Sequence, residues 1–121
     1  MPFTIVRNDI TKMKVDVIVN AANTALKMGG GVCGAIFRAA GAEKLQEACD
    51  KLAPIKTGEA VITPGFDLPA RYIIHTAGPV YHEWSREQSE QLLYSAYTNS
   101  LKLAIENKCE SIAFPLISSG I

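Results

Sequence analysis

Consecutive apolar residues alternate along this chain with stretches in which apolar residues recur every three or four positions. The first pattern predicts strands buried in a sheet, and the second predicts helices. Turn signals at Pro64-Gly65 and Gly78-Pro79 end two of the predicted strands. Such an alternation of strands and helices is typical of α/β domains. Strands are predicted at Phe3 to Arg7, Val15 to Asn20, Glu59 to Thr63, Tyr72 to Thr76 and Ser111 to Phe114.

Helices are predicted in the longer segments between these strands. The segment from Val32 to Ala40 follows a glycine-rich turn and reads as a helix. After it, Leu45, Cys49 and Leu52 recur at helical spacing until Pro54 ends the pattern.

The clearest predicted helix begins near Ser85. Ser85 and Gln88 have the spacing of a capping box, in which each side chain accepts a hydrogen bond from the other residue's backbone N–H. One face of this helix is predicted to be apolar. That face comprises Leu93, Ala96, Tyr97, Leu101, Ala104 and Ile105.

The size and charge of the chain limit the classes of function that fit it. Its 121 residues, 48% of them hydrophobic, predict one globular domain spanning residues 1–121. The 12 basic and 12 acidic side chains give zero formal net charge, which argues against nucleic acid as a partner. No basic segment precedes a long apolar run, and no run reaches membrane-spanning length. We therefore expect a cytoplasmic protein with no membrane partner.

The cysteines indicate neither a disulfide framework nor a metal site. Cys33, Cys49 and Cys109 are odd in number and widely spaced, without a Cys-x-x-Cys pair. His75 and His82 are the histidines available to complete a metal site with them. We expect free thiols and no metal.

Polar and glycine-rich segments follow several of the predicted strands. In an open α/β sheet, ligands bind outside the carboxyl ends of the strands, where the connecting loops meet. Gly29, Gly30 and Gly31 precede a predicted helix, whose first backbone N–H groups can bind phosphate when no side chain blocks them. An acid, two carboxamides and two small-residue loops at one edge suit a nucleotide sugar. The segments concerned are Asn8 to Thr11, Asn20 to Gly34 and Ser118 to Ile121.

Each of these features also has a purely structural interpretation. Asp9 and Thr11 form a common turn pair. Asn20 and Asn23 can cap a turn, and the segment 118–120 can be an ordinary strand exit. Their shared position at the strand ends favours a ligand site.

The glycine loop also matches the dinucleotide-binding pattern G-x-G-x-x-G through Gly29, Gly31 and Gly34. That pattern should follow its strand directly, with an acid ending the next strand about 20 residues later. Here the acids near that distance, Glu47 and Asp50, fall inside a predicted helix. An oxidoreductase with a nicotinamide or flavin cofactor is therefore disfavoured, and we expect no cofactor.

Motifs spread over the whole chain, in the same order, resemble those of the macrodomain family. This family of ADP-ribose-binding modules includes ADP-ribosyl hydrolases and O-acetyl-ADP-ribose deacetylases. The resemblance implies a three-layer α/β/α fold with a mixed, mostly parallel sheet. The motifs are Asn8-Asp9-Ile10-Thr11, Val19-Asn20-Ala21-Ala22-Asn23, Gly29 to Ile36 with Arg38-Ala39-Ala40-Gly41, Thr57-Gly58-Glu59-Ala60, His75-Thr76-Ala77-Gly78-Pro79 and Phe114 to Ile121.

The resemblance also implies a role for individual residues. The Asp9 carboxylate would accept a hydrogen bond from the adenine amino group, with Ile10 lining the same end of the site. The Asn23 carboxamide would bind the distal ribose, and Asn20 would support the loop from below. Oriented backbone N–H groups would balance the diphosphate. The first diphosphate loop would comprise Gly30, Gly31 and Val32, and the second Ser118, Ser119, Gly120 and Ile121.

Two positions depart from the pattern of the family's hydrolases. Cys33 stands where many of them have aspartate, and Phe37 where they have histidine. A carboxylate there could orient water or stabilise positive charge on the ribose, which a thiol does poorly. Some members of the family with a small neutral residue at that position nevertheless resemble working hydrolases. Asn23 and Cys33 are therefore the candidate catalytic positions, with a small packing residue as the alternative for Cys33.

The resemblance leaves an enzyme and a non-catalytic reader as alternatives. The enzyme would hydrolyse ADP-ribosyl bonds, as a mono-ADP-ribosyl-protein hydrolase or an O-acetyl-ADP-ribose deacetylase, and its partners would be ADP-ribose derivatives and mono-ADP-ribosylated proteins. His75, within an apolar strand, is expected to be a buried structural residue. Compared with the family, the sequence stops inside the motif at Ile121, so we expect a domain that lacks its last strand and helices.

Overall fold

The structure, a computed structural model, describes residues 9–115 and 117. Two short 3-10 helices, η1 (Ile10–Lys12) and η2 (Tyr81–Glu83), accompany the main elements. The described strands are β1 (Val17–Ala21), β2 (Ala60–Pro64), β3 (Tyr72–Thr76) and β4 (Ile112–Ala113). The described helices are α1 (Gly31–Ala40), α2 (Ala42–Asp50) and α3 (Arg86–Glu106).

Most predicted elements are present, with shifts at their ends. Strand β3 has the predicted bounds, whereas β1 begins two residues later than predicted and β4 is confined to two residues. The strand predicted at Phe3 to Arg7 lies outside the described residues. The inclusion of Leu52 in the second helix is wrong, because α2 ends at Asp50 and the Leu52 side chain is exposed.

The sheet is mixed and mostly parallel, as predicted. Its described strands lie in the order β2-β3-β1-β4. Strand β1 is parallel to both β3 and β4, whereas β2 is antiparallel to β3. The carboxyl ends of β1, β3 and β4 therefore lie at one edge of the sheet, together with the start of β2.

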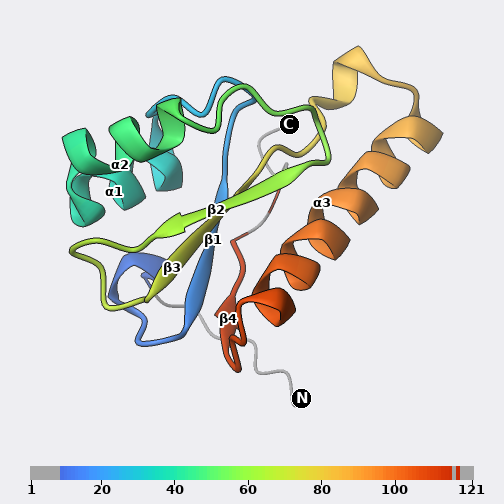
Figure 1. The fold of residues 1–121 in the computed structure, drawn as a ribbon. Helices are drawn as coiled ribbons and strands as arrows, with labels where there is room; N and C mark the ends of the chain where they lie inside the picture. The colour runs from blue at the N-terminus through green and yellow to red at the C-terminus, as the bar shows by residue number, and fades with distance from the viewer. Residues whose placement is uncertain (1–8, 116, 118–121) are drawn as a thin grey trace.

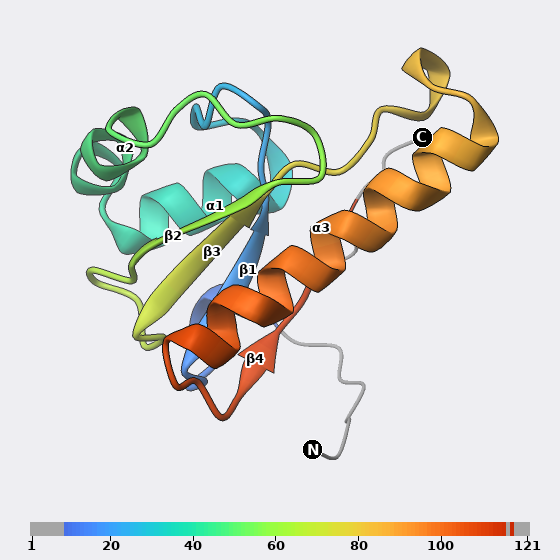
Figure 2. The ribbon, with the colours of Figure 1, turned by 45° about the vertical axis from the view of Figure 1, so that its right-hand side comes forward.

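Helices cover both faces of the sheet, which confirms the three-layer prediction. Figures 1 and 2 show α1 and α2 on one face and α3 on the other. Successive residues of β1 divide between these layers because strand side chains alternate in direction. Ile18 packs in the cluster that contains residues of α1 and α2. Val17 and Val19 pack in the cluster that contains residues of α3.

Helix α3 has the predicted capping box, and four of the six residues predicted for its apolar face, Leu93, Ala96, Tyr97 and Ala104, do pack in the core cluster on that side of the sheet. The Ser85 side chain accepts a hydrogen bond from Gln88 N, and the Gln88 side chain accepts one from Ser85 N. The prediction that Leu101 and Ile105 lie on the packed face is wrong, because they are 37% and 72% exposed. The most deeply buried positions are small residues, and two of them are serines, which a hydrophobic pattern does not count. The buried residues of α3 are Ser89, Ala96, Ser100 and Ala104.

Candidate functional site

Several loops converge at the carboxyl edge of the parallel strands. The loop after β1 (residues 22–30) runs to α1 from the edge of the sheet at which β3 also ends (Figure 1). Ala22 N donates to Thr76 O at 2.8 Å, which extends the pairing of the two strands into the loop. Gly58, just before β2, donates its N–H to Ala77 O at 2.7 Å. Backbone hydrogen bonds thus hold the β1–α1 loop, the end of β3 and the start of β2 together.

The glycine loop leaves the start of α1 open. Gly30 is the N-cap of α1 and makes no side-chain capping hydrogen bond. A Cβ added at Gly30 or Gly31 would meet no other atom within 4 Å, and Gly31 has a positive φ of 55° that favours glycine. Gly34 is required for packing, since its Cβ would lie 2.5 Å from Gly29 O. The start of α1 is therefore open at Gly30 and Gly31, as binding of an anion by its first N–H groups would require, and that binding stays a prediction.

The Asn23 side chain is built into the loop. Its Nδ2 donates to Lys27 O at 2.8 Å, and its Oδ1 accepts from Lys27 N at 3.0 Å. A carboxamide has two N–H donors and two oxygen lone pairs, so the Lys27 contacts use half of its capacity. The residue is exposed, and the other half can serve a ligand.

The apolar core holds this loop from beneath. Leu26 is 1% exposed and packs in the core cluster on the α1 and α2 side of the sheet. Its φ of 54° turns the backbone so that its N–H donates to Asn23 O at 3.1 Å. Ile55 N donates to Thr24 O at 2.9 Å on the outer side of the turn. The position of Asn23 is thus determined by both backbone pairing and core packing.

Cys33 lies beside the same loop. It is half-buried in the first turn of α1, and its Sγ lies 4.0 Å from Lys27 O, the carbonyl that Asn23 also contacts. A Cβ added at Gly29 would lie 3.9 Å from both Asn23 Nδ2 and Cys33 Sγ. The structure therefore brings together the two residues that the sequence singles out as candidate catalytic positions.

Buried polar groups support Cys33 from the sheet. Asn20 is fully buried, and its Nδ2 lies 3.6 Å from Cys33 Sγ and 3.1 Å from His75 Nδ1. Because Asn20 donates, Nδ1 of His75 accepts, and the proton of the neutral ring lies on Nε2, 3.0 Å from Thr63 Oγ1. Burial lowers the pKa of His75 to about 4, so the ring stays neutral near pH 7. The predicted structural role of His75 is confirmed, whereas support of the loop by Asn20 stays a prediction, because its side-chain contacts are with Cys33 of α1 and His75 of β3.

Asp9 has the turn geometry that its spacing with Thr11 predicts. Its Oδ1 accepts from Thr11 Oγ1 at 2.6 Å and from Thr11 N at 3.0 Å, which caps η1. These hydrogen bonds, the side-chain one first, lower the pKa of Asp9. Ile10 packs against the same core cluster as α1, so η1 adjoins that helix. A contact of Asp9 or Ile10 with adenine stays a prediction.

The predicted second diphosphate loop, Ser118 to Ile121, lies outside the described residues.

Two residues of α2 contact the loop between β1 and α1 and are not predicted from the sequence. Gln46 Oε1 accepts from Met28 N at 3.0 Å, and Asp50 Oδ1 accepts from Lys27 Nζ at 2.8 Å. These partners are 18 and 23 positions apart, so no local sequence pattern signals them.

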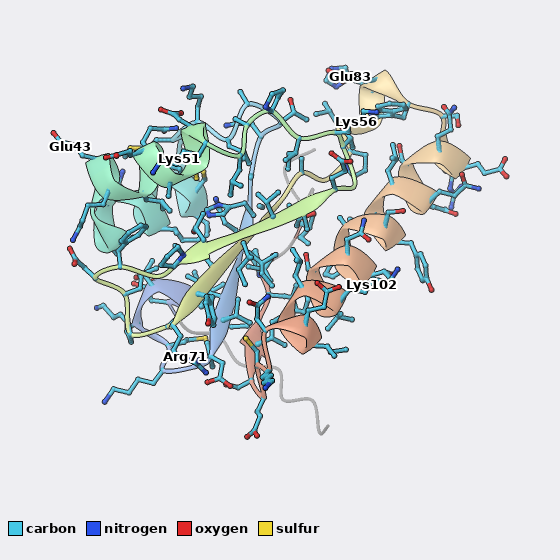
Figure 3. All side chains as sticks on the ribbon, in the orientation of Figure 1. Glu43, Lys51, Lys56, Arg71, Glu83 and Lys102 are labelled. Carbon is cyan, nitrogen blue, oxygen red and sulfur yellow. The ribbon has the colours of Figure 1, made fainter. Side chains whose placement is uncertain are left out.

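The remaining surface shows no other chemical centre in the part that is described. Figure 3 shows charged side chains on and beside the helices, such as Glu43 on α2, Lys51 just after the end of α2 and Lys102 on α3. Within residues 9–115 and 117, no group of three or more His, Cys, Asp or Glu side chains could hold a metal ion. None of the described helices is long and apolar enough to cross a membrane.

Comparison with known proteins relates this chain to macrodomains. The Macro domain family model matches residues 19–121. A Macro domain-containing protein of Chlorobaculum tepidum is 60% identical over 116 residues, which cover 96% of this chain and 66% of that protein. An O-acetyl-ADP-ribose deacetylase of Escherichia fergusonii is 54% identical, with 97% of this chain and 67% of that protein covered.

A solved macrodomain has the same fold. The Oceanobacillus iheyensis macrodomain with ADP is 48% identical and has a TM-score of 0.87, covering 93% of this chain and 62% of that chain. A mutant of the same macrodomain with ADPR (ADP-ribose) is 47% identical and has a TM-score of 0.88, covering 93% of this chain and 63% of that chain. The chain thus spans 66% of the length of the Chlorobaculum relative and 62% of the Oceanobacillus chain.

Proposed function

The chain belongs to the Macro domain family, and from that premise we propose that it binds ADP-ribose and that the complete domain hydrolyses ADP-ribosyl bonds. The observation that carries this proposal is the convergence of Asn23, Cys33 and the open N-terminus of α1 at one edge of the sheet. Related macrodomains are found with ADP and ADP-ribose or are named as a deacetylase of O-acetyl-ADP-ribose.

The ligand would lie along the loop from α1 toward η1. Its diphosphate would accept hydrogen bonds from the backbone N–H groups of Gly30, Gly31 and Val32, where the partial positive charge of the helix N-terminus favours an anion. The Asn23 carboxamide would hold the distal ribose through the capacity that Lys27 leaves. Asp9 would accept from the adenine amino group. The second phosphate loop would be formed by Ser118, Ser119, Gly120 and Ile121.

Hydrolysis would consist of water attacking the anomeric carbon of the distal ribose, which breaks its bond to the modified side chain, or attacking the acetyl carbon of an ester, which breaks its bond to the ribose oxygen. The hydroxyl of the water stays on the attacked carbon, and its proton goes to the leaving group. A thiol at position 33 is a weak acceptor for orienting that water. Water would then be oriented mainly by the ligand's own phosphate and by loop backbone. Asn23 would fix the ribose relative to that water, which lowers the entropic part of the barrier.

A comparison of ligands tests the binding half of the proposal. ADP-ribose has a second phosphate and a distal ribose that AMP lacks, so calorimetry should show tighter binding of ADP-ribose. Because the chain spans about two thirds of the length of its relatives, the measurement includes a version extended to that length. Equal affinity for the two ligands in the extended protein would contradict the placement of the diphosphate and ribose.

Turnover separates the enzyme from the alternative, a non-catalytic reader of ADP-ribose, which Cys33 favours. The extended protein is incubated with a mono-ADP-ribosylated protein and, separately, with O-acetyl-ADP-ribose. Release of ADP-ribose identifies the enzyme, and binding without any release identifies the reader. Cys33→Asp should raise the rate of release or leave it unchanged. A large fall in that variant would mean that the thiol itself contributes to the reaction.

A further inference from the structure

Gln46 of α2 bonds the backbone on both sides of Lys27. Its Oε1 accepts from Met28 N at 3.0 Å, and its Nε2 donates to Leu26 O at 3.0 Å. The Gln46 carboxamide therefore provides both a hydrogen-bond acceptor and a donor to the backbone of a loop segment that lies outside the sheet. Both backbone groups belong to the peptide units that flank Lys27.

The Lys27 residue between these two contacts is the one that holds Asn23. Both Lys27 N and Lys27 O are bonded to the Asn23 side chain. A shift of the Lys27 backbone would consequently move the carboxamide of Asn23 with it. Gln46 and Asn23 therefore bond the same two peptide units, each through a different polar atom of the unit.

Asp50, one turn further along α2, fixes the orientation of the Gln46 amide. Gln46 Nε2 also donates to Asp50 Oδ1 at 2.9 Å, and that oxygen accepts from Lys27 Nζ at 2.8 Å. A carboxylate and a carbonyl both require a donor, so the amide nitrogen must face them and its oxygen must face Met28 N. The Lys27 ion pair is exposed on both sides and contributes little by itself.

We propose that Gln46 is a positioning residue of the ligand site, which sets the direction of the Asn23 carboxamide toward the distal ribose through the Lys27 backbone. The proposal rests on the proposed function for the identity of the ligand. Gln46 acts through Asn23 and does not itself touch ADP-ribose. Its loss should therefore weaken the contact with the distal ribose and spare contacts with the rest of the nucleotide.

Gln46→Leu tests this with Gln91→Leu as the matched control, since Gln91 is an exposed residue of α3 on the other face of the sheet. Affinities for ADP-ribose and AMP are measured by calorimetry on each protein. Gln46→Leu should raise the Kd of ADP-ribose about tenfold, which corresponds to about 1.4 kcal/mol, and change the Kd of AMP less than about twofold. Gln91→Leu should change neither. A loss of affinity by the same factor for both ligands would overturn the proposal.

Amide hydrogen exchange provides a readout that needs no ligand. Exchange of the Lys27 N–H, which donates to Asn23 Oδ1, should become about tenfold faster in Gln46→Leu. The Ala22 N–H, which donates to Thr76 O, should keep its rate. An unchanged Lys27 rate would show that Gln46 does not control Asn23, and the proposal would be wrong.

A second variant covers the case in which Gln46→Leu does not fold. Gln46→Glu keeps an acceptor for Met28 N but loses the donor to Leu26 O and sets a second carboxylate against Asp50, so its Lys27 exchange should be faster and its ADP-ribose affinity lower than in the unmodified protein. Values equal to those of the unmodified protein would contradict the proposal that Gln46 holds the loop through both its donor and its acceptor. If the unmodified protein binds no ADP-ribose, the proposed function fails, and the exchange comparison still decides the role of Gln46.

Discussion

Asn23 combines a structural and a proposed chemical role in one side chain. Its contacts with Lys27 hold the turn, and the hydrogen-bonding capacity that these contacts leave is proposed to bind the ribose. Such double use makes a simple deletion hard to interpret, because loop geometry and ligand contact are lost together. Turnover and the Kd of ADP-ribose should therefore be measured together, because they respond differently to the loss of the Asn23 side chain.

Asn23→Ala should lower turnover by on the order of 100-fold, because a misplaced ribose misaligns the attacked carbon from its water. The Kd of ADP-ribose should rise by less than about tenfold, since the phosphate contacts remain. Steady-state kinetics and calorimetry measure the two effects. Asn107→Ala is the matched control, because its Nδ2 likewise donates to a backbone carbonyl, Leu103 O, at the far end of α3. Equal factors for turnover and binding would assign Asn23 to binding alone.

His75 should make stability depend on pH in a defined window. The folded state lowers the pKa of His75 from 6.5 to about 4, so below pH 6.5 the unfolded chain binds a proton that the folded chain does not. Stability should therefore decrease as the pH falls from about 6.5 to about 4, by up to about 3 kcal/mol. Urea unfolding at several pH values should show this slope in the unmodified protein and in His82→Gln, an exposed histidine. His75→Gln should remove most of it, and an undiminished slope would show that other groups cause it.

At the scale of elements, α3 shows which features a sequence can and cannot reveal. Its capping box is a local pattern and is predicted correctly from Ser85 and Gln88. Its packed face depends on which side chains of the sheet lie opposite each position. Ser100 can be fully buried because its Oγ donates to Ala96 O at 2.7 Å. A serine bonded to its own helix costs little to bury, so a hydrophobic pattern finds Ala96 and Ala104 on this face but omits Ser100.

Ser85→Ala should lower the free energy of unfolding by about 0.5–1 kcal/mol, because Gln88 N loses its acceptor at the exposed first turn of α3. Ser95→Ala, the same change inside the same helix, should be neutral or slightly stabilising, since alanine has the higher helix propensity. Urea unfolding measures both. A Ser85→Ala variant as stable as Ser95→Ala would show that the first turn of α3 frays without affecting the rest of the protein.

At the scale of the whole molecule, the order of strands and helices is predictable and the long-range polar contacts are not. Apolar runs locate β1 and β3, and their parallel ends explain why the candidate site forms where the sequence places it. The contact of Asn20 with His75 joins residues 55 positions apart, and that of Gln46 with Leu26 joins residues 20 apart. Such pairs follow from packing, which single-sequence patterns do not encode.

Self-association and ADP-ribose affinity should differ between a polypeptide of residues 1–121 alone and one extended to the length of the relatives. Among the described residues, the two-residue strand β4 ends the sheet, and exposed backbone at a sheet edge pairs with other chains. The shorter polypeptide should therefore self-associate and bind ADP-ribose more weakly than the extended one. Light scattering and calorimetry measure the two effects.

A matched variant distinguishes the sheet edge from the other exposed apolar surface. Ile105 is 72% exposed on α3, so Ile105→Lys would suppress association that runs through that helix. If the sheet edge is responsible, Ile105→Lys should leave the scattering of the shorter polypeptide unchanged, whereas the extension should abolish it. A monodisperse monomer of residues 1–121 that binds ADP-ribose as tightly as the extended protein would contradict the prediction. That result would mean that residues 1–121 suffice for the ligand site.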